Sequence, residues 1–136
     1  IAENFQWVQT VDRIKVADRL NMFNTDQTPL NICIQINISN EDTKSGVKIE
    51  EIDALADHIN TLDKLKLRGL MAIPSNTSED KILMNEYKQL KMIYENLKFR
   101  YSTIDTLSIG MSNDYLLAVE NGSNLVRIGS KIFGSR

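Results

Sequence analysis

Glycine and serine occur together after two apolar stretches in the second half of the chain. Gly110 and Ser112 follow "IDTLSI", while Gly129 and Ser130 follow "LVRI". Glycine lets the backbone approach an anion closely, and backbone N–H groups and serine hydroxyls donate hydrogen bonds to its oxygens. The two pairs therefore predict a phosphate-binding site. The alternative is that all four are only turn residues.

Arg127 lies inside the second apolar stretch, where a charged guanidinium requires a partner. Because side chains alternate along a strand, Arg127 is expected to face away from Val126 and Ile128. The interior of a barrel, near the phosphate end, is one destination for it. A structural arginine paired with a carboxylate is the alternative.

Three other residues with reactive side chains have simpler interpretations. Lys44 lies in a polar loop and is expected to be solvated, and His58 is expected on the surface of a helix. Cys33 lies in an apolar run and is expected to be a reduced core residue. With one cysteine and one histidine, the chain has neither a Cys/His metal pattern nor a Ser-His-Asp arrangement. No metal site is predicted.

The composition bounds the class of protein. The 136 residues suffice for one domain at most, with 42% hydrophobic and 25% charged residues, as in ordinary globular proteins. A net charge of −2 without a basic patch gives little support to nucleic-acid binding. No run of 18 apolar residues predicts a membrane span, and a single cysteine favours a cytoplasmic location.

Segments typical of strands and helices alternate along the chain. Apolar and β-branched runs predict five strands, over 5–11, 30–39, 65–73, 104–112 and 125–128. Strands joined by helical crossovers are parallel. The pattern therefore predicts an α/β fold, either a doubly wound sheet or a barrel, with function gathered at the C-terminal ends of the strands.

Four helices are expected between these strands. Asp12 is the expected cap of the first, and either Asn113 or Asp114 of the fourth, which ends at Asn121 and Gly122. The third opens within 78–80. Apolar residues at helical spacing give the buried faces of the first three, namely Ile14, Ala17 and Leu20; Ile52, Leu55, Ala56, Ile59 and Leu62; and Leu83, Tyr87, Leu90, Tyr94 and Leu97.

Several long motifs occur in one order, namely "TVDR", "PLNICIQINIS" with "EDTKSGV", "LKLRGLMAIP", "IDTLSIGMSNDYLLAVENGS" and "LVRIGSKIFGSR". Together they resemble the pyridoxal phosphate homeostasis protein family, single-domain relatives of the alanine racemase N-terminal barrel. The resemblance implies a (β/α)8 TIM-barrel type fold. Residues 1–136 would be the C-terminal part of one such domain, an incomplete barrel with about five parallel strands. The three N-terminal strands, with the Schiff-base lysine on the first, are then expected to lie outside the printed sequence.

The resemblance also implies a cofactor, pyridoxal 5′-phosphate (PLP), and roles for particular residues. Arg127 would face the pyridine nitrogen. Lys44 matches the lysine of the family's "KSG" motif and is a secondary candidate, as is Met71 by its position. The phosphate would lie against the ends of the last two strands, at Gly110, Met111, Ser112, Gly129 and Ser130.

A charged donor at the ring nitrogen disfavours protonation of that nitrogen and makes PLP a poorer electron sink. This fits intracellular PLP homeostasis without robust catalysis, with PLP-dependent apo-enzymes as partners. One alternative is a PLP-dependent enzyme of the alanine racemase barrel class, which needs the lysine and a second acid/base residue. Others are a phosphate-binding barrel of different chemistry and a remnant with no activity. Because five strands leave open edges, the chain alone is expected to be marginally stable, prone to aggregation, or dependent on a partner that carries the missing strands.

Overall fold

The computed structural model describes residues 1–41, 43–77 and 79–134. Five parallel strands form one sheet in the order β1-β2-β3-β4-β5. They are β1 (Trp7–Val11), β2 (Leu30–Ile36), β3 (Leu65–Ala72), β4 (Thr106–Met111) and β5 (Leu125–Arg127). The predicted α/β fold with five parallel strands is confirmed, although each strand is shorter than its apolar run.

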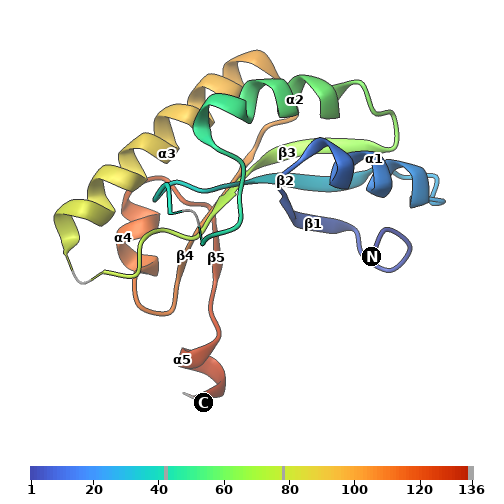
Figure 1. The fold of residues 1–136 in the computed structure, drawn as a ribbon. Coiled ribbons are helices and arrows are strands. Elements are labelled where there is room, and N and C mark those ends of the chain that lie inside the picture. Colours follow the sequence, from blue (N-terminus) through green and yellow to red (C-terminus); the bar gives the residue numbers. More distant parts are fainter. Residues whose placement is uncertain (42, 78, 135–136) are drawn as a thin grey trace.

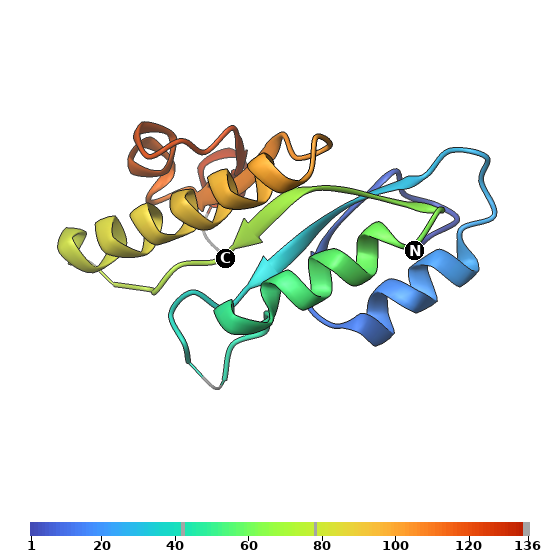
Figure 2. The same cartoon turned by 90° about the horizontal axis from the view of Figure 1, so that it is seen from above.

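The helices α1 to α4 lie along the outer face of a curled sheet, whose inner face is open, while α5 projects beyond the end of β5 (Figures 1 and 2). Within the described residues, no helix is long and apolar enough to cross a membrane. The helices are α1 (Ile14–Phe23), the 3-10 turn η1 (Ile49–Glu51), α2 (Ile52–Asn60), α3 (Asp80–Arg100), α4 (Tyr115–Glu120) and α5 (Ser130–Phe133).

Three details differ from the sequence predictions. Asp12 does not cap α1: its carboxylate binds the neighbouring guanidinium, with Oδ1 2.8 Å from Nε of Arg13, which is itself the N-cap residue. Ile14 was expected in the core but is 46% exposed. The elements η1 and α5 were not predicted, because each spans four residues or fewer and shows no apolar period.

The ends of α3 and α4 match the sequence only in part. Asp114 occupies the N-cap position of α4, but its side chain makes no capping hydrogen bond, because its carboxylate accepts from N of Met111 at 2.7 Å and from the Tyr87 hydroxyl. Asn121 is the C-cap of α4, as expected, followed by Gly122 at a φ of +98°. In α3, which begins at Asp80 after the N-cap Glu79, all five predicted core residues are buried. Its start at Asp80 lies within the predicted range 78–80, of which position 78 is outside the described residues.

The two faces of the sheet have different chemistry. Residues at matching register, such as Ile34, Leu70 and Leu107, are buried in one apolar core beneath the helices. The alternate residues face the inside of the curl, where Gln35, Met71 and Ser108 share one register position. Period-two alternation therefore gives this domain an apolar outer layer and a partly polar inner face.

A contact across the inner face shows how strongly the sheet curls. Ser108 of β4 donates from Oγ to Oε1 of Gln9 in β1, at 2.7 Å, although β2 and β3 lie between these strands. In a flat sheet β1 and β4 would be about 14 Å apart. The inner face is therefore the wall of a half-barrel.

Arg68 joins several strands at the amino-terminal end of this wall. Its Nε donates to Oδ1 of Asp105 at 3.0 Å, its Nη2 also binds that carboxylate, and its Nη1 donates to Oδ1 of Asn31 at 2.8 Å. The guanidinium carbon lies 4.7 Å from the ring centroid of Trp7. This cluster links the start of β4 to β1, β2 and β3, at the end of the sheet opposite the predicted phosphate site.

Hydrogen bonding to Arg68 lowers the pKa of Asp105. Because the pKa is lower in the folded state, the pair stabilises the fold fully at pH values above the ordinary carboxyl pKa of about 3.9. This stabilisation is lost as the pH falls through the lowered pKa of the folded state. We expect Asp105→Asn to lower the free energy of unfolding at pH 7 by under about 1 kcal/mol, since the carboxylate is half exposed. The variant should lose less stability than the natural chain between pH 4 and 2. Urea unfolding of both proteins at several pH values in this range measures the difference. If the unfolding free energy falls equally with pH in both proteins, the assignment is wrong.

Gly110 and Gly122 provide a matched pair for testing a close approach of two elements. Both have a φ of +98°, but a Cβ on Gly110 would lie 2.6 Å from Cβ of Ala118 in α4, whereas one on Gly122 would meet nothing closer than 3.6 Å. We expect Gly110→Ala to lower the free energy of unfolding by about 1–3 kcal/mol more than Gly122→Ala does. Denaturant unfolding of both variants measures the difference, and equal losses would mean that α4 moves aside freely.

Candidate functional site

The ends of β4 and β5 meet at the carboxyl edge of the sheet. Met111 pairs in register with Arg127, and the segments that follow both strands are joined through Ser112. Its Oγ accepts hydrogen bonds from the N–H groups of Gly129, at 3.3 Å, and of Lys131, at 3.4 Å. The structure therefore brings together the residues that the sequence predicted at the ends of the last two strands.

Gly129 lies in front of open space. A Cβ built on it meets no other atom within 4 Å, and its φ of −121° is one that any residue adopts. The turn therefore does not require glycine here. Gly110 is different, because its positive φ and its contact with Ala118 both require the missing side chain. Of the two predicted glycines, the first has a clear structural reason and the second does not.

Arg127 lies on the inner face and is half buried. Its Nη1 donates to the carbonyl oxygen of Ser108 at 2.9 Å and to Oγ of Ser108 at 2.7 Å, and its Nη2 donates to the carbonyl oxygen of Ala72 at 2.9 Å. In the described ranges no carboxylate lies within ion-pair distance of it. The alternative of an arginine paired with a carboxylate is therefore wrong for this part of the chain.

The surroundings of Arg127 leave its charge uncompensated. Burial lowers the pKa of its guanidinium below the ordinary value, and the negative charge of Asp114 acts in the opposite direction. A guanidinium has five N–H donors, and three of those of Arg127 have acceptors among residues 1–41, 43–77 and 79–134. Two donors remain for a further acceptor at this edge of the sheet.

The two secondary candidates lie at the same edge. Met71 is buried on the inner face, at the register position of Ser108. Nζ of Lys44 lies 2.8 Å from Oε1 of Glu41 and 3.4 Å from the carbonyl oxygen of Pro74, and 27% of its side chain is exposed. This lysine is partly exposed, and its contacts hold it between the segments that follow β2 and β3.

The remaining candidates lie away from this edge or within the wall. Nε2 of His58 lies 2.6 Å from Oδ1 of Asp18, on the outer helices α2 and α1, so its predicted surface position is confirmed. Cys33 is a free, fully buried cysteine, as expected, and burial raises the pKa of its thiol to about 12. Within the described part of the chain no three His, Cys, Asp or Glu side chains form a cluster suited to a metal ion.

Sequence reasoning missed the residues that hold Arg127. Ser108 was treated only as part of an apolar strand, and Gln9 as part of the first strand. Their positions were the available signal, since each is a polar side chain inside a predicted strand: Ser108 lies between two apolar residues, and Gln9 lies between two β-branched residues. What the sequence lacks is the curl that brings β1 to β4, and hence the contact between these two residues.

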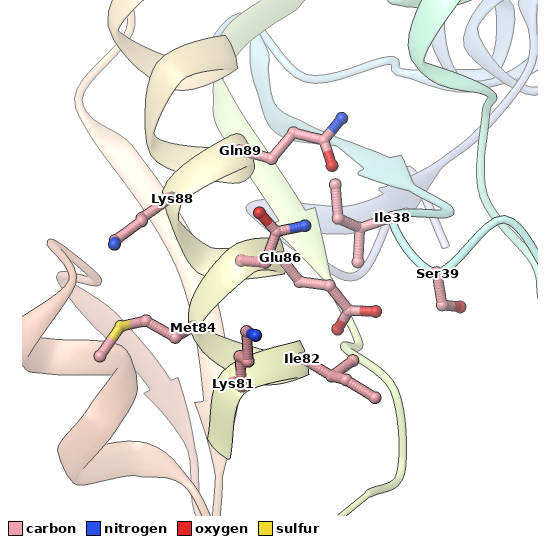
Figure 3. A pocket seen from close by; sticks show the side chains of 9 residues that line it. Ile38, Ser39, Lys81, Ile82, Met84, Glu86, Lys88 and Gln89 are labelled. Carbon is pink, nitrogen blue, oxygen red and sulfur yellow. The ribbon is translucent and has the colours of Figure 1, made fainter. Parts of the chain in front are cut away.

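A hollow of about 600 Å³ lies elsewhere, between α3 and the segment after β2. Figure 3 shows Ile38 and Ser39 on one side and α3 side chains, including Glu86, on the other. The buried carboxylate of Glu86 accepts from N of Ser75 at 2.8 Å and from its Oγ at 2.5 Å. Glu86 thus fixes the segment after β3, and the hollow contains none of the predicted cofactor residues.

The family model for the alanine racemase N-terminal domain matches residues 1–136. The chain belongs to this family. It is 47% identical over 137 residues to the pyridoxal phosphate homeostasis protein of Escherichia coli, and 49% identical over 139 residues to that of Haemophilus influenzae. These alignments cover the whole chain but only 58% and 59% of the two relatives. The resemblance predicted from the sequence is confirmed.

Solved structures agree with this assignment. PipY of Synechococcus elongatus with PLP bound has a TM-score of 0.86 at 25% identity, over 98% of the present chain and 63% of its own. Its structure without PLP has a TM-score of 0.89 at 26% identity, with the same coverage. Alanine racemase of Corynebacterium glutamicum, at 14% identity and a TM-score of 0.67 over 96% of this chain and 36% of its own, shares the fold.

The hydrogen bonds to Ser112 give a direct test of how the segment after β5 is held. We expect Ser112→Ala to accelerate amide hydrogen exchange at Gly129 and Lys131, with a loss of unfolding free energy under about 1 kcal/mol because both bonds are long. Ser130→Ala is the control, since the hydroxyl of Ser130 makes no hydrogen bond in the described ranges. Exchange that is equally fast in both variants would contradict this role for Ser112.

Proposed function

We propose that the chain binds PLP at the carboxyl edge of β4 and β5. The cofactor's phosphate would lie against Ser112, Gly129 and Ser130, with Gly110 and Met111 lining the same edge. The observation that carries this proposal is the open space before Gly129, where two backbone N–H groups already point toward a single oxygen atom. A phosphate oxygen is an acceptor for the same donors.

Arg127 fits the other end of the same cofactor. Its guanidinium keeps two N–H donors for a ring nitrogen and carries no compensating carboxylate within the described part of the chain. An aromatic ring nitrogen accepts a hydrogen bond, and a permanent positive charge beside it disfavours its protonation. Bound PLP supplies an aldehyde reactive toward amines and a ring that stabilises carbanions. Arg127 would weaken the second property and leave the first intact.

The relatives indicate the biological role. Those at 44–49% identity are named pyridoxal phosphate homeostasis proteins, and PipY was solved with PLP bound. We therefore propose that the chain serves PLP homeostasis without robust catalysis of its own, with PLP and PLP-dependent apo-enzymes as partners. Residues 1–136 would act as one part of a single PLP-binding barrel domain. A cytoplasmic location is supported by the free, buried thiol of Cys33.

Lys44 and Met71 keep secondary roles in this proposal. Met71 supports the inner face beneath the ring through its register position with Ser108. The ammonium group of Lys44 lies against Glu41 and the carbonyl of Pro74, on the segments after β2 and β3. It would be an amine at the barrel mouth, with its charge held by Glu41.

The phosphate end of the site is tested by changing charge at the open position. Gly129→Asp and Gly129→Asn place side chains of nearly equal size where the added Cβ meets nothing. We expect the aspartate variant to bind PLP about 10- to 100-fold more weakly than the asparagine variant, because two negative charges a few ångströms apart repel each other near the protein surface. Titrating each variant with PLP, followed by absorbance, measures the ratio.

Pyridoxal, which lacks the phosphate, is the matched control ligand. We expect the two variants to bind pyridoxal equally, since the charge has nothing to repel. If the aspartate and asparagine variants bind PLP equally well, the phosphate does not lie at Gly129 and the proposed site is wrong.

A further inference from the structure

We propose that Ser108 and Gln9 are positioning residues, which orient Arg127 through a hydrogen-bonded chain across the inner face and thereby set the preference for a ligand ring that contains nitrogen. This inference rests on the proposed function, because it assumes that Arg127 meets the cofactor ring. Neither residue belongs to the phosphate end of the site, and both lie on the wall of the half-barrel.

The direction of the chain follows from the donors and acceptors present. Arginine only donates, so Oγ of Ser108 accepts from Nη1 of Arg127 at 2.7 Å. A hydroxyl has a single hydrogen, which Ser108 donates to Oε1 of Gln9 at 2.7 Å. The order is therefore Arg127 to Ser108 to Gln9, from β5 through β4 to β1.

Ser108 is suited to hold the guanidinium because it acts through two atoms. Its carbonyl oxygen and its hydroxyl both accept from Nη1, at 2.9 and 2.7 Å, so both hydrogens of that nitrogen are fixed. The residue is fully buried, and a buried hydroxyl needs partners. Without Oγ, one hydrogen of Nη1 loses its acceptor, and the guanidinium is held by two carbonyl oxygens instead of by three acceptors.

Gln9 links the orientation of Arg127 to the curl of the sheet. It lies on the first strand, and its contact with Ser108 joins residues 99 positions apart in the sequence. A change in curl would move the amide oxygen away from Ser108 and release its hydroxyl to rotate. The orientation of Arg127 is therefore tied to the closure of the half-barrel.

A buried serine on a neighbouring element separates positioning from general stability. Oγ of Ser123 lies near the carbonyl oxygens of Leu107, at 3.2 Å, Ile109, at 2.7 Å, and Leu125, at 3.1 Å, and makes no hydrogen bond with Arg127 in the described residues. Ser123→Ala removes a buried hydroxyl of the same kind as Ser108→Ala does. It should therefore affect stability without affecting which ring is preferred.

The experiment compares two ligands on the full chain. Dissociation constants are measured for PLP and for its analogue with carbon in place of the ring nitrogen, and their ratio reports the contact with that nitrogen. We expect the natural chain to prefer PLP, Arg127→Met to abolish the preference, and Ser108→Ala to reduce it about three- to tenfold, the size of one hydrogen bond. Gln9→Met should reduce it in the same direction, and Ser123→Ala should leave it unchanged.

The outcomes distinguish failure of this inference from failure of the proposed function. An unchanged ratio in Ser108→Ala and Gln9→Met, with the preference lost in Arg127→Met, overturns the positioning role and leaves the site as proposed. No preference in the natural chain overturns the ring contact of Arg127 and the inference with it. Should Ser108→Ala not fold, the half-buried Gln9 still decides, because its substitution removes the acceptor of the Ser108 hydroxyl and leaves the core intact.

Discussion

The curl of the parallel sheet is the constraint on which the rest of the structure depends. Helices cover only the outer face, so the core of isoleucine, leucine and valine side chains is one-sided. The inner face then collects the alternate residues of each strand, and curling brings them close enough to bond across intervening strands. Ser108 and Gln9 are in contact for this reason alone, since pairing between adjacent strands would never join β1 to β4.

Arg127 shows what this inner face makes possible. In a flat sheet with one exposed side, the guanidinium would lie in water and would need no partner. Within the curl it is half buried, and carbonyl and hydroxyl oxygens of β3 and β4 accept from three of its five N–H donors. Neutral acceptors stabilise the orientation without cancelling the charge. A carboxylate partner would hold the side chain equally well but would leave no net charge for a ligand.

The fold could be predicted from the sequence because its signals are local. Runs of β-branched residues mark the strands, and the stripe from Leu83 to Leu97 marks α3, whose five core residues are all buried. The predicted cap at Asp12 failed because the adjacent Arg13 offers its carboxylate a charged donor, which competes with the backbone N–H groups. The restraint on Lys44 was also missed, since Glu41 and Pro74 approach it only when the segments after β2 and β3 fold together.

The candidate site also has one part that depends on local contacts and another that depends on contacts between distant strands. Ser112, Gly129 and Lys131 lie within 20 residues of one another, at the ends of two adjacent strands, so their arrangement depends on the pairing of β4 with β5. Sequence motifs identified Ser112 and Gly129 as candidates for that reason, although not Lys131. The arrangement around Arg127 instead draws on β1, β3, β4 and β5. The proposed anion end of the site should therefore survive disturbance of the sheet's curl better than the proposed ring end, whose geometry depends on the whole half-barrel.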